Sequence, residues 1–207
     1  MRRPLQSQPP RSLLRISGTV SDRSREQLVT TWTGLPLELS SPVQVAFLPD
    51  LTAHRGKLLS RADRGTPVYA ASFIRQRRIV IEQDLLSSPA VLRFIFVHEL
   101  FHFVWVRLGN TRRGEYSRLL MAELAGKARG ELGESSAVKK AELQLDHELS
   151  PGSKLWRDYA CESFCDSAAS IFTEGPVHEG ARLGKAWSKL RRQWLLQKLA
   201  DRCRWAV

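Results

Sequence analysis

The chain has 207 residues, of which 43% are hydrophobic and 8% aromatic, a composition that excludes a wholly disordered protein. Lys and Arg number 32 against 21 Asp and Glu, which gives a formal net charge of +11 and a pI near 10.2. Such a charge favours contact with nucleic acid, anionic lipid or acidic proteins, but it does not distinguish among them.

The longest apolar run, 91–106, is interrupted by four polar or charged residues and is too short to predict a membrane span. The N-terminal segment has no apolar core of the kind found in cleavable signal peptides. Three cysteines do not suggest a disulfide framework. Cys161 and Cys165 could in principle ligate a metal, but we interpret them as small helix-packing residues. We therefore expect a cytoplasmic protein.

Residues 1–20 are rich in Arg, Pro, Ser and Gln and predict a flexible basic arm, followed by a single domain over 21–207. In chain order, the first half predicts a helix from Ser21 or Asp22 to Gly34, a strand at 42–48, a basic loop at 54–65, and extended segments at 68–74 and 79–86 around an RQRR turn at 75–78.

A long helix follows, with Ser88 as N-cap, Pro89 at its first position and Gly109 and Asn110 at its end. Further helices are expected at 116–132, 141–149 and 155–175, and a basic amphipathic helix within 180–205. The order predicts an α+β fold, in which a small mixed sheet is followed by this long helix and a mostly helical C-terminal half.

The long helix contains the stretch FVHELFHFVW, with His98, Glu99 and His102. Positions i and i+4 of a helix share a face, so both histidines can point at one metal ion. Glu99 lies close enough to hold a water molecule without being a ligand. The surrounding residues are apolar, and burying these groups without partners would cost a few kcal/mol, about the penalty of an unpaired buried polar group. The pattern therefore predicts a catalytic Zn²⁺ site.

A catalytic zinc needs a third protein ligand. In YACESFCDSAAS, Glu162 and Asp166 are four residues apart and share a helix face. The small residues around them would allow this helix to approach the helix of His98 closely. Glu162 is the predicted third ligand, and Asp166 is predicted to accept a hydrogen bond from a ligand histidine.

Other residues remain open as third ligands at this point. The strongest rival is His147, because another group of zinc peptidases uses a third histidine; the others are Glu123, Glu148, Asp158 and His178. A donor that stabilises the oxyanion of the transition state is also expected, and Tyr159 or His178 are the candidates. Tyr159 can equally be a core aromatic.

The two motifs together, H-E-x-x-H at 98–102 and E-x-x-x-D at 162–166, resemble the gluzincin branch of zinc metallopeptidases, which is the branch of thermolysin. In that branch the two histidines and the later glutamate bind zinc, and the glutamate of the first motif is the general base. The resemblance implies that His98, His102 and Glu162 hold the ion, that Glu99 is the base and that Asp166 is the later aspartate.

The resemblance covers about residues 67–175 and implies a compact zincin-like domain, in which the strand IVIEQDLL precedes the metal-binding helix. The 60 residues between His102 and Glu162 imply an insertion relative to the thermolysin branch. The compact size and the lack of an export signal are more similar to intracellular ImmA/IrrE-type metallopeptidases. The implied activity is hydrolysis of a peptide bond, with narrow or regulated specificity set by residues 55–78 and 130–155.

Basic clusters support an alternative function. They are formed by Arg2, Arg3 and Arg11, by the RQRR at 75–78 and by the tail with Trp187 and Trp194. They could contact nucleic acid or an anionic membrane. For the tail we favour buried tryptophans with solvated Lys and Arg. The alternative is a non-catalytic binding or regulatory protein that contacts nucleic acid or a partner protein, and a third reading treats HELFH as a structural polar triad. Substrate identity and oligomeric state have no signal in the sequence.

Overall fold

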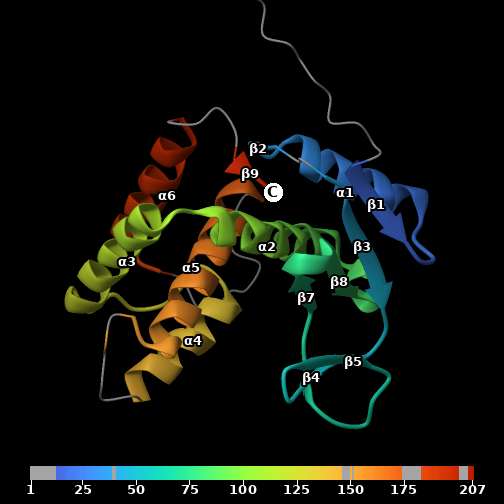
Figure 1. Ribbon diagram of the computed structural model, residues 1–207, viewed down its shortest axis with the longest axis horizontal. Coiled ribbons are helices and arrows are strands. Elements are labelled where there is room, and N and C mark those ends of the chain that lie inside the picture. Colours follow the sequence, from blue (N-terminus) through green and yellow to red (C-terminus); the bar gives the residue numbers. More distant parts are fainter. Residues whose placement is uncertain (1–12, 39–40, 146–149, 151, 174–182, 201–204) are drawn as a thin grey trace, which may run out of the picture.

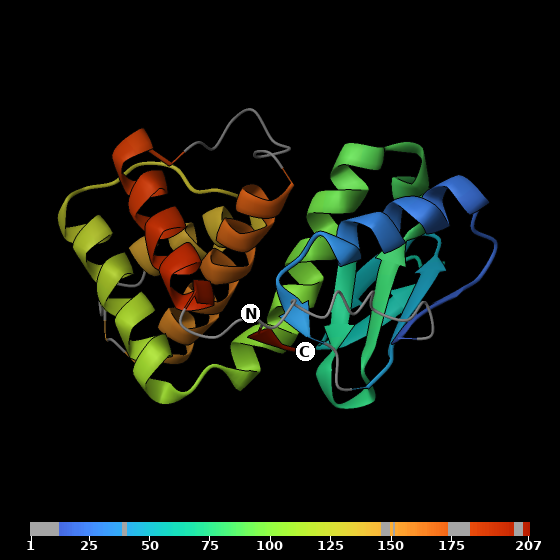
Figure 2. The same cartoon turned by 90° about the horizontal axis from the view of Figure 1, so that it is seen from above.

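The computed structural model describes residues 13–38, 41–145, 150, 152–173, 183–200 and 205–207. It contains a half built from strands and two helices and a half built from four helices (Figures 1 and 2). Helix α2 (Pro89–Arg107) runs through both halves. The predicted α+β fold is confirmed.

The main sheet has the order β1-β3-β8-β7. Strands β1 (Leu14–Ser17), β3 (Val43–Leu48) and β8 (Arg78–Glu82) are parallel, and β7 (Ala70–Phe73) pairs antiparallel with β8 at the edge. Ile79, Val80 and Ile81 are all buried, as expected for a central strand covered by helices. The sheet is mixed and small, as the sequence predicts.

Two departures concern the N-terminal region. Residues 14–17, which the sequence places in the arm, form strand β1, so the predicted arm does not reach residue 20. Residues 1–12 lie outside the described part. A separate two-stranded sheet joins β2 (Leu37–Glu38) in parallel to β9 (Trp205–Ala206), which brings distant parts of the chain together.

A small antiparallel sheet replaces the predicted loop at 54–65, and that prediction is wrong. Strands β4 (Leu51–His54), β5 (Lys57–Ser60) and β6 (Thr66–Pro67) have the order β5-β4-β6. Arg55 and Gly56 form the two-residue turn with φ of 48° and 75°, the left-handed conformations that a tight hairpin requires. Because Arg tolerates this conformation less well than Asn or Gly, the sequence carries a weak hairpin signal here.

Most helix ends follow from local chemistry. Helix α1 (Asp22–Thr33) begins where Ser21 Oγ accepts a hydrogen bond from Ser24 N at 3.1 Å and ends at Gly34, as predicted. Helix α2 begins at Pro89, but Ser88 makes no side-chain cap. The predicted 75–78 turn contains the 3₁₀ helix η2 (Ile74–Gln76), and η3 (Gln83–Ser87) leads into α2.

The helical half comprises α3 (Asn110–Ala125), α4 (Glu134–Leu145), α5 (Lys154–Phe172) and α6 (Lys185–Ala200). Helices α3 and α4 begin earlier than the apolar patterns predict, at residues 110 and 134 rather than 116 and 141. Their first turns are mostly polar, so hydrophobic periodicity does not detect them.

Helix α2 forms the centre of the core. Ten of its residues are buried, including Phe96, Leu100 and Phe103 at 0% exposure. Among the described helices it alone has the length and apolar composition of a membrane span, and 56% of its most apolar stretch is buried inside the structure. A buried core helix meets the same criteria of length and composition.

Helix α6 docks through its apolar side, as favoured for the tail. Leu195 is fully buried, and the ring of Trp194 lies 5.0 Å from that of Tyr116. Leu190 is 41% exposed, so the predicted stripe is only partly covered. Arg191, expected on the solvated side, is fully buried.

Candidate metal centre

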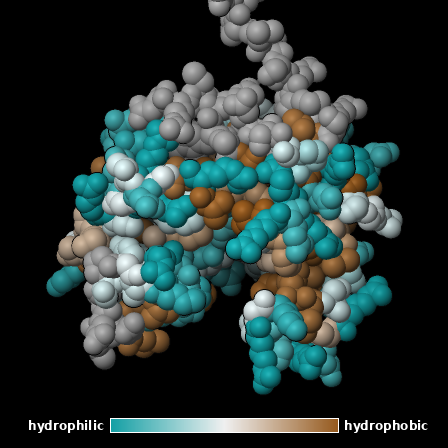
Figure 3. Space-filling model, viewed as in Figure 1, coloured by the Kyte–Doolittle hydropathy of each residue, from teal (hydrophilic) through white to brown (hydrophobic). Residues whose placement is uncertain are grey.

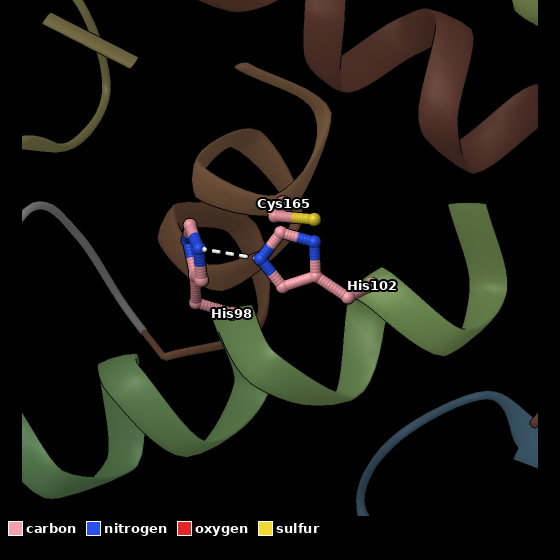
Figure 4. Close-up of side chains that lie close together, drawn as sticks. All are labelled: His98, His102 and Cys165. Atoms are coloured by element: carbon pink, nitrogen blue, oxygen red, sulfur yellow. Dashed lines mark hydrogen bonds between the residues drawn. The ribbon is translucent and has the colours of Figure 1, made fainter. Parts of the chain in front are cut away.

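The two histidines of α2 converge as their spacing predicts. Figure 4 shows their rings pointing toward one another from successive turns of the helix. The Nε2 atoms of His98 and His102 lie 3.1 Å apart, and the ring centroids 4.9 Å apart. Two nitrogens at this distance can share a proton. They are equally placed to bind one metal ion together.

Helix α5 brings Glu162 to the same point from 60 residues further along the chain. Its Oε2 lies 3.1 Å from His98 Nε2 and 3.8 Å from His102 Nε2. The circle through these three atoms has a radius of about 2.0 Å, which matches Zn–N and Zn–O bond lengths of about 2.0–2.2 Å. Three atoms spaced in this way can all lie at bonding distance from one zinc ion.

Asp166 lies one turn beyond Glu162 and supports His98 from behind. Its Oδ1 lies 2.7 Å from His98 Nδ1, so Nδ1–H can donate to the carboxylate while Nε2 faces the ligand position. The other oxygen accepts a hydrogen bond from Ser136 N at 2.8 Å, in the first turn of α4. A helix N-terminus favours an anion, which suits the position of this carboxylate.

Gly133 completes this support. It packs against the carboxylate so closely that a Cβ at this position would overlap Asp166 Cγ, Oδ1 and Oδ2. Sequence reasoning missed Gly133 and Ser136, since a glycine and a serine near a helix start are ordinary signals of a loop. They bring a third segment of the chain, between α3 and α4, to the metal centre.

His102 is supported by a thiol. Cys161 Sγ lies 3.4 Å from His102 Nδ1, the nitrogen opposite the ligand position. Cys165 lies close to the same ring (Figure 4), and its Sγ is within 4.8 Å of a ring nitrogen of each histidine. Two further groups, His98/His102/Cys165 and His102/Cys161/Glu162, also come within reach of one ion. The cysteines were interpreted as helix-packing residues; Cys165 is buried in the core, whereas Cys161 also contacts the site.

Glu99 lies beside the ligands and lines the same cleft. It is 7% exposed, and its Oε2 lies 2.6 Å from Ser72 Oγ on the edge strand β7. The same hydroxyl lies 2.9 Å from Glu99 O, so it can donate to either oxygen. Ser72 was not identified from the sequence, although it lies within residues 55–78, which were expected to set specificity.

The buried histidines and carboxylates of this centre shift one another's pKa values. Burial opposes protonation of His98, but Asp166 and Glu162 outweigh it and raise its pKa well above the usual value. Burial likewise opposes protonation of His102, yet the hydrogen bond to Cys161 and the charge of Glu162 raise its pKa to about 9. Burial alone would raise the pKa of Glu162, but the two histidines lower it to about 2.

Among the described residues, no lysine or arginine forms a hydrogen bond or ion pair with Glu99, Glu162 or Asp166. Lys139 lines the same cleft and lowers the pKa of Glu162 without such a contact. Protons on the histidines supply the cationic charge in direct contact with Glu162 and Asp166. A divalent cation would neutralise the same carboxylates and leave both imidazoles neutral.

The centre opens into a cleft of about 500 Å³. Figure 3 shows a notch below α2, between the helical half and the β4–β6 sheet. The side chains of His102 and Glu162 are 19% and 22% exposed, so water can reach the ligand position. Other lining residues come from β7, α2 and α4, among them Tyr69, Ala70, Ile95, Val106 and Val138.

Several candidates from the sequence are placed elsewhere. The expectation that Tyr159 stabilises an oxyanion is wrong, because its fully buried hydroxyl donates to Glu131 Oε1 at 2.7 Å. Glu123 is no rival ligand, since it pairs with Arg191. Asp158 pairs with Lys154 on the surface. The remaining candidates His147, Glu148 and His178 lie outside the described residues.

The chain matches no protein-family model, no curated protein and no solved structure with which it was compared. The resemblance to gluzincins thus stays a prediction that rests on the two motifs, and the function is inferred from the geometry of the site.

Proposed function

We propose that the protein is a zinc-dependent hydrolase of peptide bonds, with His98, His102 and Glu162 as ligands. The observation that carries this proposal is the convergence of their three ligand atoms on one point, next to Glu99 and open to a cleft. Catalytic zinc sites have three protein ligands and one position open to water, and structural sites are closed.

The protein's own groups have separate tasks. A bound zinc ion would supply Lewis-acid activation of water and of the substrate carbonyl. Glu99 accepts the proton of the attacking water and passes it to the leaving amine. Ser72 orients the Glu99 carboxylate through its hydrogen bond of 2.6 Å. Asp166 holds His98 in the tautomer with Nδ1 protonated and Nε2 free.

Strand β7 offers a place for an extended substrate. It is an edge strand, and Ala70, Ala71 and Ser72 line the cleft beside the ligands. A peptide that adds to a sheet edge gains backbone hydrogen bonds and places alternate side chains in pockets. The gluzincin-like motifs support the same reaction class.

The first test is the zinc content of the untagged chain by elemental analysis. We expect one zinc per wild-type chain and a loss of zinc affinity of more than about 100-fold in Glu162→Ala, because loss of a ligand exceeds the effect of losing an outer partner. Glu142→Ala removes an equal charge from an exposed acid on α4 and should retain zinc. Full retention in Glu162→Ala would assign the third ligand to Cys161, Cys165 or His147.

The second test separates metal binding from catalysis. Glu99→Gln should retain zinc and lower the rate of peptide hydrolysis at least about 100-fold, since it removes only the general base. The substrate is a broad library of fluorogenic peptides. Failure of the zinc-loaded, folded wild-type chain to cleave any member would refute the peptidase proposal, and absence of zinc after reconstitution would make the histidines structural.

A further inference from the structure

The β4–β6 sheet, defined here as residues 51–67, carries a concentrated positive charge. Its basic residues are Arg55, Lys57, Arg61 and Arg64, and its one acidic residue is Asp63. All four basic side chains are exposed. Arg55 lies at the hairpin turn, and Arg61 and Arg64 lie in the connection between β5 and β6.

These four cations are unpaired, unlike several other basic residues of the described chain. Lys139, Lys154 and Lys198 each form an ion pair, and Arg191 forms two. In the described part of the chain, none of the four basic residues of the β4–β6 sheet forms an ion pair or a side-chain hydrogen bond. Their charge is therefore available to a partner.

The sheet is attached directly to the catalytic cleft. Its last strand leads into Val68 and Tyr69, which line the cleft, and Val68 N donates to Leu51 O at 3.1 Å. At its base, the Glu82 carboxylate accepts hydrogen bonds from the N–H groups of Asp50 and Leu51. Figures 1 and 3 show the sheet below β7, where it borders the notch.

We propose that the β4–β6 sheet is a docking surface for an acidic segment of the substrate protein, which lies beside the peptide bond that is cleaved. This inference rests on the proposed peptidase function. A chain that lies along β7 leaves the cleft at the sheet, where Glu or Asp side chains would meet the four exposed cations. Such peripheral charges speed association and select partners by complementary potential.

The surface fits an acidic peptide better than a nucleic acid. The half-buried Leu58 and Leu59 lie among the basic residues and offer apolar contact to side chains. Residues 51–67 contain no Phe, Tyr or Trp on which a base could stack, and such stacking contributes to the binding of single strands.

The test compares two fluorescent peptides with the same apolar centre, Ala-Leu-Phe-Ala, flanked on either side by four Glu or by four Gln. Binding to the full, zinc-loaded Glu99→Gln chain is followed by fluorescence anisotropy at low and high salt. We expect the Glu peptide to bind at least about tenfold more tightly at low salt, because four exposed charge pairs act together. High salt should remove the difference.

The variant for this test carries four substitutions: Arg55→Asn, Arg61→Asn, Lys57→Gln and Arg64→Gln. Asn is chosen because Arg55 and Arg61 have φ of 48° and 54°, which Asn tolerates. This fourfold variant should bind the Glu peptide and the Gln peptide equally. The matched control removes four exposed basic side chains away from the cleft and should keep the preference: Arg23→Gln, Arg93→Gln, Arg118→Gln and Arg192→Gln.

Equal binding of both peptides by the Glu99→Gln chain with the basic sheet intact would overturn the proposal, as would a preference that survives loss of the four charges. A 20-base-pair DNA duplex serves as the competing probe. DNA binding that depends on the four charges, without any preference for Glu, would assign the sheet to nucleic acid and also overturn it. If the Glu preference holds but the wild-type chain cleaves nothing, the peptidase function fails and the docking surface stands.

Discussion

The molecule contains two buried clusters of charged residues, and the two clusters compensate the charge of their carboxylates in different ways. In one, Arg191 lies between Glu123 and Glu131; its Nη2 is 2.5 Å from Glu123 Oε2, its Nη1 is 2.7 Å from Glu131 Oε2, and all three residues are fully buried. In the other, the metal centre, the carboxylates face histidines and a cleft. The first cluster contains an arginine in direct contact with its carboxylates, whereas in the second no lysine or arginine of the described chain makes such a contact.

This difference distinguishes a cluster whose buried charges stabilise the fold from one whose buried charges can serve a function. Lys140 adds a second cation to the closed cluster, and Tyr159 donates a further hydrogen bond to Glu131. The charges there are satisfied without any ligand, as buried charges must be. At the proposed metal centre, protons on the histidines or a metal ion offset the charge of the carboxylates, and water can reach the site from the cleft. We infer that only the second cluster exchanges its cation.

The largest effect is expected from a substitution in the closed cluster, formed by Arg191, Glu123, Glu131 and Lys140. Arg191→Ala would leave two buried glutamates without a counter-ion and should lower the free energy of unfolding by about 3–5 kcal/mol. Urea denaturation measures this loss, which should be present with or without zinc. Arg192→Ala, at the exposed neighbouring position, should change it by less than about 0.5 kcal/mol. A cost below about 1 kcal/mol for Arg191→Ala would show that water solvates the two acids.

A smaller effect is expected from a change at the support of the metal centre. Gly133→Ala places a Cβ against the Asp166 carboxylate, which must shift and release His98. Zinc affinity should fall by about 10–100-fold, the usual effect of losing an outer hydrogen-bond partner of a ligand. Competition with a chelating dye measures the affinity.

Gly114→Ala is the matched control for this substitution. Gly114 lies within α3, and a Cβ there would meet nothing within 4 Å. Zinc affinity should not change, and stability should rise by up to about 1 kcal/mol because Ala is the better helix former. Unchanged zinc affinity in Gly133→Ala would show that Asp166 does not hold His98.

The smallest expected effect is the pH dependence of the metal-free protein. The pKa of His102 is raised to about 9, so its contribution to stability is complete below its ordinary pKa of about 6.5 and is lost as pH rises through 9. The melting temperature of chelator-treated protein should fall by about 3 °C or more between pH 6.5 and 9.5.

Bound zinc should change this dependence. It requires neutral imidazoles, so its affinity should rise over the same pH range. In metal-free His102→Gln the decline should shrink, because the titrating ring is absent. A melting temperature of the metal-free wild type that is flat over this range would contradict the assignment of the proton to the centre.

The sequence predicts the part of the site that depends on helical spacing. His98 and His102 are four residues apart, as are Glu162 and Asp166, and a regular helix alone places each pair on one face. The contact between the two helices follows from the small residues of α5 and the apolar residues of α2. The convergence of these side chains could thus be predicted although 60 residues separate His102 from Glu162.

The remainder depends on contacts between distant segments. Arg191 looked like one of several solvated cations on α6, because sequence periodicity cannot show that two glutamates meet it 68 and 60 residues away. Gly133 and Ser72 act through close approach and through a cross-element hydrogen bond, and neither has a sequence signature. The hairpin at 51–60 was missed because an Arg-Gly turn is an uncommon one.

The position of Arg191 near the end of the sequence affects when the helical half can fold during synthesis. Glu123, Glu131 and all the proposed metal ligands leave the ribosome before Arg191 does. Until α6 has been made, burial of the two glutamates would be opposed by their uncompensated charge. The helical half can therefore complete its assembly only after α6 has emerged, and the nascent chain must keep these acidic residues in water while its last segment is synthesised.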